Sequence, residues 1–538
     1  MLIEYRAANL KSNKKNLIDK GPSKFKLWLN SHWPDLVIIF SLILFAAAIR
    51  IPKLMEVPLF ADEIADVKAV YKMMLEQTVH LRSPVSPYTG PVLHYLLEGF
   101  MKTFGVNIYM PRILILILGV LTVPLLYCWC KSMGNRVSGL IAGLLLSLNL
   151  PHIIINSHIA WSNSMTPFFL ILAITIMYYS VKNNKGPLLI IGGFLLGISL
   201  QTHPSVLVIF PGILIWYLAR RDIGSRLKRP WPYLTVFAVL LGYANMIAYN
   251  LVNKFASVKY ISQKQTYAFI NRPSISTYFT SLLAELGELS KAISGVMPRQ
   301  VFPTGLPLSL TILYISWLIA GMVFIIVKKR QIMPLVLLLS SLLVMPYFNK
   351  AYPGGITIHY ISFMIPISFA IMGLFAAEFI NIHKWIINRR SASIIFAALI
   401  TIVFIAYPAF QITTYYRNEI RDGNTNAPII AIVKELRKAR DSNEEIFVEK
   451  DLERFSMIAG NQLLWTFESL LLLDGTPYRL ISEGIIVETA LDNREKGYRT
   501  WFILTSNDFN KASEIISLKP IMINPGPGND GSYGLFNF

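Results

Sequence analysis

The stretch PRILILILGVLTVPLLYCWC (residues 111–130) carries one charged side chain, Arg112, and is otherwise almost entirely apolar. A second apolar stretch, VSGLIAGLLLSLNLPHIII (residues 137–155), follows after the short basic loop KSMGNR (residues 131–136). About 20 apolar residues in a helix span the hydrocarbon core of a bilayer. The two stretches therefore predict two membrane-spanning helices joined by a short loop.

The same pattern recurs along the chain and predicts a polytopic α-helical membrane protein with about 11 transmembrane helices. We place these spans at residues 34–51, 111–130, 137–155, 164–181, 187–201, 205–219, 233–252, 307–327, 332–348, 358–380 and 393–411. Only 15% of the 538 residues are charged, whereas soluble chains carry about 25%. The composition therefore excludes an ordinary soluble protein.

The distribution of charge predicts the orientation of these helices. The chain has a net charge of +19, but residues 412–538 hold 14 Lys and Arg against 18 Asp and Glu, a net charge of −4. The positive charge thus lies in the N-terminal arm and in alternate loops, which include Lys131, Lys182 and the segment 220–229. Basic loops face the cytoplasm. This pattern indicates a bilayer partner and no nucleic acid.

Three regions follow from this orientation. Residues 1–33 form a cytoplasmic basic arm, residues 34–411 the transmembrane domain, and residues 412–538 an extracytoplasmic domain. The transmembrane domain has two long outer loops, at residues 52–110 and 253–306.

The first outer loop contains two patterns typical of amphipathic helices at the membrane interface. In the first pattern, an apolar face is expected opposite a charged face; the apolar members are Ile64, Val67, Tyr71, Met74 and Leu75, and the charged members are Asp66, Lys68, Lys72 and Glu76. The second is GPVLHYLLEGFMKTFG (residues 90–105).

The tail alternates strand-like and helix-like segments. EIFVEK, PYRLIS, TWFILTS and PIMINP are typical of strands, whereas APIIAIVKELRKAR and NDFNKASEIISL are typical of helices. The closing segment NPGPGNDGSYGLFNF is rich in turn residues. This alternation predicts a small α/β domain.

Polar side chains at the predicted outer ends of the spans are the candidates for chemistry. Asp62 and Glu63 follow the first span directly; they could simply cap a helix in water, or one could serve as a general base. Histidines and cations at the same face could hold a phosphate. These candidate binding residues are Arg112, His158, His203, Lys350, His359 and Tyr360.

No cofactor signature accompanies these residues. The two cysteines, Cys128 and Cys130, lie within one apolar span without a second ligand pair. No phosphate-binding glycine motif is present. We therefore expect no metal and no nucleotide cofactor; a divalent cation is compatible with the chemistry, but no motif supports it.

Four segments carry a resemblance to a known family. They are PLFADE (58–63), GPVLHYLLEGFMKTFGVNIYMPRILILILGVLTVPLLY (90–127), GISLQTHPSVLVIFPGIL (197–214) and GGITIHYISFMIPISFAIMG (354–373). In order and spacing they resemble the GT-C superfamily of glycosyltransferases that use polyprenyl-phosphate sugars. The resemblance is greatest to the protein mannosyltransferase and aminoarabinose transferase type (family 39, RgtA/B/C/D-like), and it covers roughly residues 34–411.

The resemblance implies site roles. The first acid of the pair, Asp62, matches the family's proposed catalytic base, and Glu63 matches its neighbour. Arg112 matches the arginine that opens the second span, and His359 with Tyr360 matches the pair before the tenth. Two positions depart from the pattern, since Gly90 stands where aminoarabinose transferases have Lys, and Asn163 stands where many relatives have a second acid.

The expected activity is transfer of a hexosyl or pentosyl unit, with inversion, from a polyprenyl-phosphate sugar to a hydroxyl of a cell-envelope lipid, glycan or protein. The expected location is a prokaryotic plasma membrane. Two other functions remain open: a transporter or flippase of lipid-linked sugars, and a noncatalytic protein of envelope assembly. The sequence shows no half-to-half repeat of the kind that many transporters contain.

Overall fold

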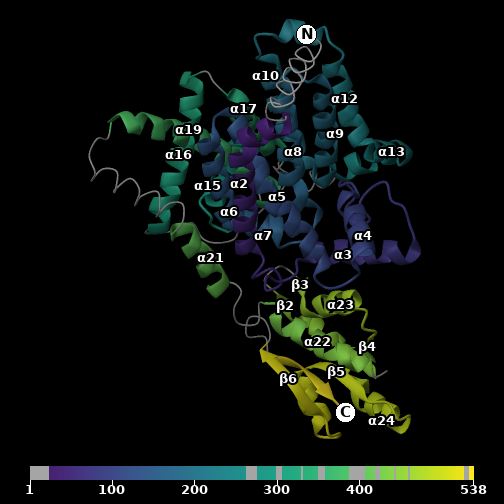
Figure 1. The fold of residues 1–538 in the computed structure, drawn as a ribbon. Helices are drawn as coiled ribbons and strands as arrows, with labels where there is room; N and C mark the ends of the chain where they lie inside the picture. The colour runs from purple at the N-terminus through teal and green to yellow at the C-terminus, as the bar shows by residue number, and fades with distance from the viewer. Residues whose placement is uncertain are drawn as a thin grey trace, which may run out of the picture.

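The computed structural model describes residues 24–261, 275–297, 306–328, 331–348, 358–386, 406–418, 425–441, 444–457, 461–525 and 532–538. A helical bundle occupies one end of the molecule and a smaller α/β domain the other (Figure 1). In chain order, the helices of the bundle and its loops are α2 (Lys24–Arg50), α3 (Ala61–Glu76), α4 (Val92–Phe104), α5 (Met110–Met133), α6 (Arg136–Leu148), α7 (Leu150–Ser157), η1 (Ser162–Met165), α8 (Thr166–Lys182), α9 (Gly186–Thr202), η2 (Pro204–Ile209), α10 (Phe210–Leu218), α11 (Ile223–Leu227), α12 (Trp231–Gly242), α13 (Ala244–Val252), α15 (Ile275–Ile293), α16 (Leu306–Lys328), α17 (Ile332–Phe348), α18 (Ile358–Ile361), α19 (Met364–Ile386) and α21 (Tyr407–Asn418).

The first ten predicted spans coincide with apolar helices. Within the described ranges, four helices are long and apolar enough to cross a membrane, and two bent pairs bring the number to as many as six. Four shorter apolar helices account for the other predicted positions. Most of the eleventh, at 393–411, lies outside the described residues, so the count of eleven stays a prediction. Its expected end at 411 falls inside α21, so this helix crosses the expected domain boundary.

Local sequence explains the bend in the third span. The pair α6 and α7 is bent by 69°. Pro151 in the first turn of α7 has no N–H for the helix that precedes it. Asn149 starts α7 anew because its side chain accepts a hydrogen bond from the His152 N–H at 3.0 Å.

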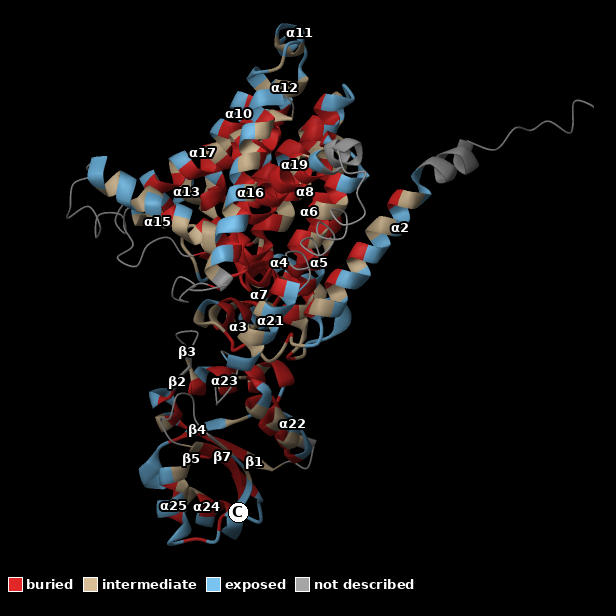
Figure 2. Ribbon diagram, turned by 90° about the vertical axis from the view of Figure 1, so that its left-hand side faces the viewer, coloured by how far each residue is buried: buried red, intermediate tan, exposed pale blue. Residues whose placement is uncertain are grey.

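Burial distinguishes the interior of the bundle from its rim. Figure 2 shows the buried residues concentrated along α5, α6, α8 and α19, whereas α2 lies at the edge. On α2 large apolar side chains point outward, among them Trp33, Phe40 and Leu44. An outward apolar face suits contact with lipid, where the hydrophobic surface needs no protein cover.

The two predicted helices of the first outer loop are present as α3 and α4, and α4 ends just before Gly105, whose φ is positive at 87°. The predicted faces of α3 need correction. Asp66 was expected on the solvent side and is 6% exposed, whereas Leu75 of the expected apolar face is 69% exposed. The reason is that α3 is covered from two sides, by the turn at 160–162 and by helix α23 of the C-terminal domain.

The C-terminal domain has the predicted α/β character, and its helices cover both faces of the main sheet. Its elements are α22 (Ala427–Asp441), β1 (Glu445–Glu449), η4 (Lys450–Arg454), β2 (Ser456–Met457), β3 (Asn461–Gln462), α23 (Leu463–Asp474), β4 (Arg479–Ile481), η5 (Glu483–Ile485), α24 (Ile486–Glu495), β5 (Thr500–Thr505), α25 (Ser506–Ser513), β6 (Lys519–Pro525) and β7 (Ser532–Asn537). The main sheet has the order β4-β1-β5-β7-β6. Strands β4, β1 and β5 are parallel, and β7 and β6 are antiparallel to their neighbours.

Alternate residues of the strands face the two helical layers, as the period of a β-strand requires. Ile446 and Val448 of β1 share a core with α22 and α23, whereas Phe447 faces α24 and α25. Strand β7 was not predicted; it lies in the closing segment that the sequence indicated only as turns. Gly534 is needed there because a Cβ would overlap the Met522 carbonyl oxygen of β6.

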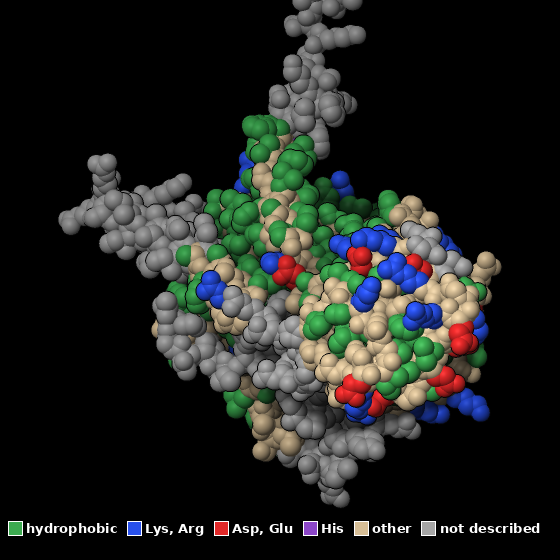
Figure 3. Space-filling view, turned by 90° about the horizontal axis from the view of Figure 1, so that it is seen from below, with side chains coloured by type: hydrophobic (Ala, Val, Ile, Leu, Met, Phe, Trp, Pro, Cys, Tyr) green, Lys and Arg blue, Asp and Glu red, His purple; other side chains and the backbone are tan. Residues whose placement is uncertain are grey.

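The domain packs against the first outer loop. One continuous core joins Ile64 and Val67 of α3 with Phe467 and Leu470 of α23. Lys68 Nζ of α3 lies 2.9 Å from Glu468 Oε2 of α23. Seen from below, the domain surface carries charged side chains of both signs, and hydrophobic surface lies on the bundle behind it (Figure 3).

Candidate functional site

Asp62 and Glu63 occupy the first turn of α3 but differ completely in surroundings. Asp62 is exposed, whereas Glu63 is 1% exposed. Glu63 Oε2 accepts the Phe60 N–H at 3.3 Å, so the expected capping of the helix is found for this member of the pair. Both carboxylates suit the positive end of the helix dipole.

Glu63 forms a two-point ion pair with Arg112. Arg112 Nε lies 2.8 Å from Glu63 Oε1, and Arg112 Nη2 lies 2.8 Å from Glu63 Oε2. The other donors of the guanidinium bind the carbonyl oxygens of Leu54, Val57 and Pro58 at 2.9, 2.6 and 3.1 Å. Since a guanidinium has five N–H groups, this arrangement leaves none for a lipid phosphate. Arg112, expected to bind phosphate, instead fixes the segment that leads into Asp62.

Acidic side chains of α3 also hold the turn after α7. Glu63 Oε1 accepts the Ala160 N–H at 3.1 Å, and Asp66 Oδ2 accepts the Ser162 N–H at 3.3 Å. Asp66 therefore places a carboxylate at the turn where the family resemblance would have an acid at position 163. The sequence contained one signal for it, the spacing of four residues after Asp62, which puts both on one helical face.

An unbroken series of rings starts beside Asp62. Phe60 lies two residues before it and packs against Trp161. The successive centroid distances are 5.7 Å for Phe60–Trp161, 4.8 Å for Trp161–His359, 4.2 Å for His359–Tyr360, 4.9 Å for Tyr360–His203 and 6.2 Å for His203–Tyr88. Three predicted site residues from distant parts of the chain are thus brought together. Phe60 and Trp161 were missed because ring stacking across loops leaves no periodic pattern.

His158 is not part of this ring series, and its ring nitrogens bond to other residues. Its Nε2 is 2.7 Å from the Arg50 carbonyl oxygen, and its Nδ1 is 3.2 Å from the Tyr416 hydroxyl. Both ring nitrogens are therefore engaged within the protein. Arg50 itself is fully buried and was not predicted; it donates to Ser157, to His152 and to the carbonyl oxygens of Ala46, Leu146 and Ser147.

Two further positions named from the sequence are Lys350 and Gly90. Lys350 lies outside the described residues. Gly90 donates its N–H to the Gln201 carbonyl oxygen at 2.7 Å, and a Cβ at position 90 would overlap the Gln201 side chain. A lysine in place of Gly90 would thus require Gln201 to move.

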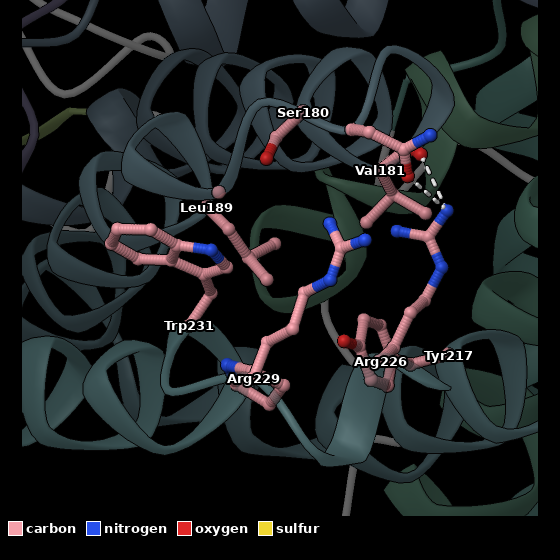
Figure 4. A pocket seen from close by; sticks show the side chains of 10 residues that line it. Ser180, Val181, Leu189, Tyr217, Arg226, Arg229 and Trp231 are labelled. Carbon is pink, nitrogen blue, oxygen red and sulfur yellow. Dashed lines mark hydrogen bonds between the residues drawn. The ribbon is translucent and has the colours of Figure 1, made fainter. Parts of the chain in front are cut away.

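A small pocket lies between α3, α5 and α23, and Glu63, Arg112 and Ser469 are among its lining residues. Another pocket, shown in Figure 4, lies between α8, α9 and α12 and includes Arg226 and Arg229. This second pocket is at the end of the bundle opposite the C-terminal domain (Figure 2). It is therefore separate from the Asp62 site.

Comparison with known proteins identifies the fold. Residues 86–249 match the family model described as dolichyl-phosphate-mannose-protein mannosyltransferase. The structure resembles the crystal structure of ArnT from Cupriavidus metallidurans bound to undecaprenyl phosphate, with a TM-score of 0.56 and 11% identity over 93% of this chain and 97% of that one. The apo state of the same ArnT gives a TM-score of 0.53 and 11% identity over 94% and 98%.

A weaker likeness, with a TM-score of 0.49 and 12% identity over 88% of this chain and 70% of that one, is to the archaeal oligosaccharyltransferase AglB from Archaeoglobus fulgidus. No curated protein sequence matches the chain. The family model and the fold confirm the expected resemblance to the GT-C superfamily, of the mannosyltransferase and ArnT type. Together with the apolar helices, they make the chain an integral membrane protein.

Proposed function

We propose that the chain is a membrane glycosyltransferase that moves a sugar from a polyprenyl-phosphate donor to a hydroxyl of a cell-envelope lipid, glycan or protein. One observation carries the proposal: Asp62 is exposed at the start of α3, while the residue beside it is fixed in a buried ion pair. A carboxylate that is reachable, yet held on a rigid support, is what a general base requires.

In this reaction Asp62 takes the proton of the acceptor hydroxyl. The acceptor oxygen then forms a bond to the anomeric carbon, while the bond from that carbon to the phosphate oxygen breaks and its electron pair leaves with the lipid phosphate. A single displacement of this kind inverts the anomeric carbon. Glu63 and Arg112 do not touch the reacting atoms; they position the segment that carries Asp62.

The lipid phosphate is assigned to the side chains that remain. We propose His359, Tyr360 and His203 as its binding residues, with Lys350 as the cation. The faces of Trp161 and its neighbouring rings offer an apolar surface for the sugar or the first prenyl units. His158 is assigned to positioning, because its ring nitrogens are engaged by Arg50 and Tyr416.

The orientation rests on loop charge. Basic loops in the cytoplasm and an odd number of spans would put Asp62 and the C-terminal domain outside the plasma membrane of a prokaryote. The proposed limits are residues 1–33 for the cytoplasmic arm, 34–411 for the transmembrane domain and 412–538 for the outer domain. Gly90 argues for a sugar other than aminoarabinose, and we propose no nucleotide or redox cofactor.

The test is incubation of the purified full chain with a set of radiolabelled polyprenyl-phosphate sugars and envelope lipids, glycans or peptides. Transfer of label to an acceptor is the expected result. Movement of donor across proteoliposome membranes without any covalent product would instead establish a transporter. If the protein shows no transfer and no transport with any donor, that result would favour the noncatalytic alternative.

A further inference from the structure

The carboxyl ends of two neighbouring parallel strands in the C-terminal domain bring three acidic side chains together. Strand β1 ends at Glu449 and β5 ends at Thr505, and the two strands are paired in parallel. Asp451 follows β1 in η4, and Asp508 lies in the first turn of α25. In open α/β sheets, ligands bind at this edge of the strands.

The three carboxylates are within reach of one ion. One oxygen from each of Glu449, Asp451 and Asp508 can be chosen so that all three lie within 4.8 Å of one another. Oxygens that ligate one Ca²⁺ or Mg²⁺ ion lie at most about 5 Å apart. The three carboxylates are therefore close enough to one another to ligate one divalent cation.

The charge in this cluster is only partly compensated within the domain. Arg454 Nη2 lies 3.0 Å from Asp451 Oδ2. Glu449 is 0% exposed and Asp508 is 3% exposed. Glu449 Oε2 accepts the Thr505 N–H at 2.6 Å, but Glu449 Oε1 has no hydrogen-bond partner among the residues that the structure describes. A buried carboxylate oxygen without a partner is costly. Lys511 Nζ lies 3.6 Å from Asp508 and also pairs with Glu483, so it neutralises the charge of Asp508 only in part.

We propose that Glu449, Asp451 and Asp508 form a site for a hard divalent cation, of which Ca²⁺ is the first to test. Glu449 Oε1 would supply the buried ligand, and Asp451, which is partly exposed, would supply the ligand on the open side. An all-carboxylate donor set favours hard cations such as Ca²⁺, Mg²⁺ and Mn²⁺ over Zn²⁺.

The site would stabilise the part of the domain that supports α3. Element η4 packs against α23, and α23 packs against α3, where Lys68 and Glu468 form their ion pair. Bound cation would fix the end of β1 to the start of α25 and hold η4 beneath α23. This inference does not rest on the proposed transferase activity, because binding can be measured without turnover.

The experiment measures Ca²⁺ binding to the full-length protein in a nonionic detergent after removal of metal with EDTA. Binding is followed with ⁴⁵Ca²⁺, and the melting temperature is recorded with and without Ca²⁺, Mg²⁺ or Mn²⁺. Wild type should bind Ca²⁺ and melt at a higher temperature with it. Since loss of a mere supporting contact weakens metal sites by about 10- to 100-fold, Glu449→Gln and Asp451→Asn should each weaken binding at least that much.

Glu488→Gln is the matched control, because Glu488 is an exposed carboxylate on α24 of the same domain. It should bind Ca²⁺ as wild type does. Glu449→Gln relieves repulsion from Asp508, so without metal this variant should be at least as stable as wild type. If wild type shows no bound Ca²⁺ and no thermal shift with any of the three ions, or if Glu449→Gln and Asp451→Asn respond like wild type, the cation site is refuted.

Discussion

Glu63→Gln distinguishes a residue that builds the site from one that performs the reaction. The substitution keeps the size of the side chain but removes its charge. Arg112, which is 1% exposed, would then be a buried cation without an anion. The new amide group would also present N–H atoms toward Arg112, where two oxygens now accept at 2.8 Å.

Loss of one partner from a buried ion pair costs about 3–5 kcal/mol. For Glu63→Gln we therefore expect a melting temperature that falls by roughly 5 °C or more in detergent. Asp62→Asn changes an exposed side chain and should alter stability by no more than about 0.5 kcal/mol. Thermal unfolding of the purified variants, followed by intrinsic fluorescence, measures both.

The double variant Glu63→Gln/Arg112→Met provides the internal control. Because it removes both charges together, its loss of stability should be smaller than the sum of the two single losses by about 1–3 kcal/mol. If Glu63→Gln melts like wild type yet has lost all transfer, Glu63 takes part in the chemistry, and the positioning role is wrong.

Three further outcomes are expected. His359→Ala should raise KM for the polyprenyl-phosphate donor by about 10-fold or more, with an unchanged melting temperature, if His359 contacts the lipid phosphate; an unchanged KM would contradict that contact. Burial raises the pKa of Glu285 from 4.5 to about 9. Between these pH values the folded state keeps a proton that the unfolded state loses, so the free energy of unfolding should fall as pH rises. Glu285→Gln should remove that fall, and a melting temperature that depends on pH in the variant as it does in wild type would refute this reasoning. Lys68→Met breaks the partly exposed pair with Glu468 and should cost at most about 1 kcal/mol; a much larger loss would mean that this pair anchors the C-terminal domain.

The sequence predicted the features that depend on local pattern. Long apolar segments must satisfy their backbone groups within a helix in lipid, so ten of the predicted spans coincide with apolar helices or bent pairs. Alternation of strand and helix likewise identified the α/β character of the tail. Strand β7 was missed because its glycine serves close packing of two strands, which cannot be distinguished from a turn in sequence alone.

Contacts between distant segments were not predictable in this way. Arg112 was expected to bind phosphate, but its donors are taken by carbonyl oxygens at the start of the first outer loop and by Glu63. The burial of Asp66 depends on two neighbours that lie far away in the chain. The acids at Glu449 and Asp508 meet only because β1 and β5 are paired in parallel.

The most direct test of the proposed reaction is a single-turnover assay with purified Asp62→Asn, run beside wild type and Glu76→Gln, an exposed carboxylate at the other end of α3. The donor is a labelled polyprenyl-phosphate sugar that wild type uses. Removal of a general base should slow transfer by about 10²- to 10⁴-fold, while Glu76→Gln should match wild type, and NMR of the wild-type product should show an inverted anomeric carbon. Transfer by Asp62→Asn at the wild-type rate would contradict the assignment of Asp62 as the base.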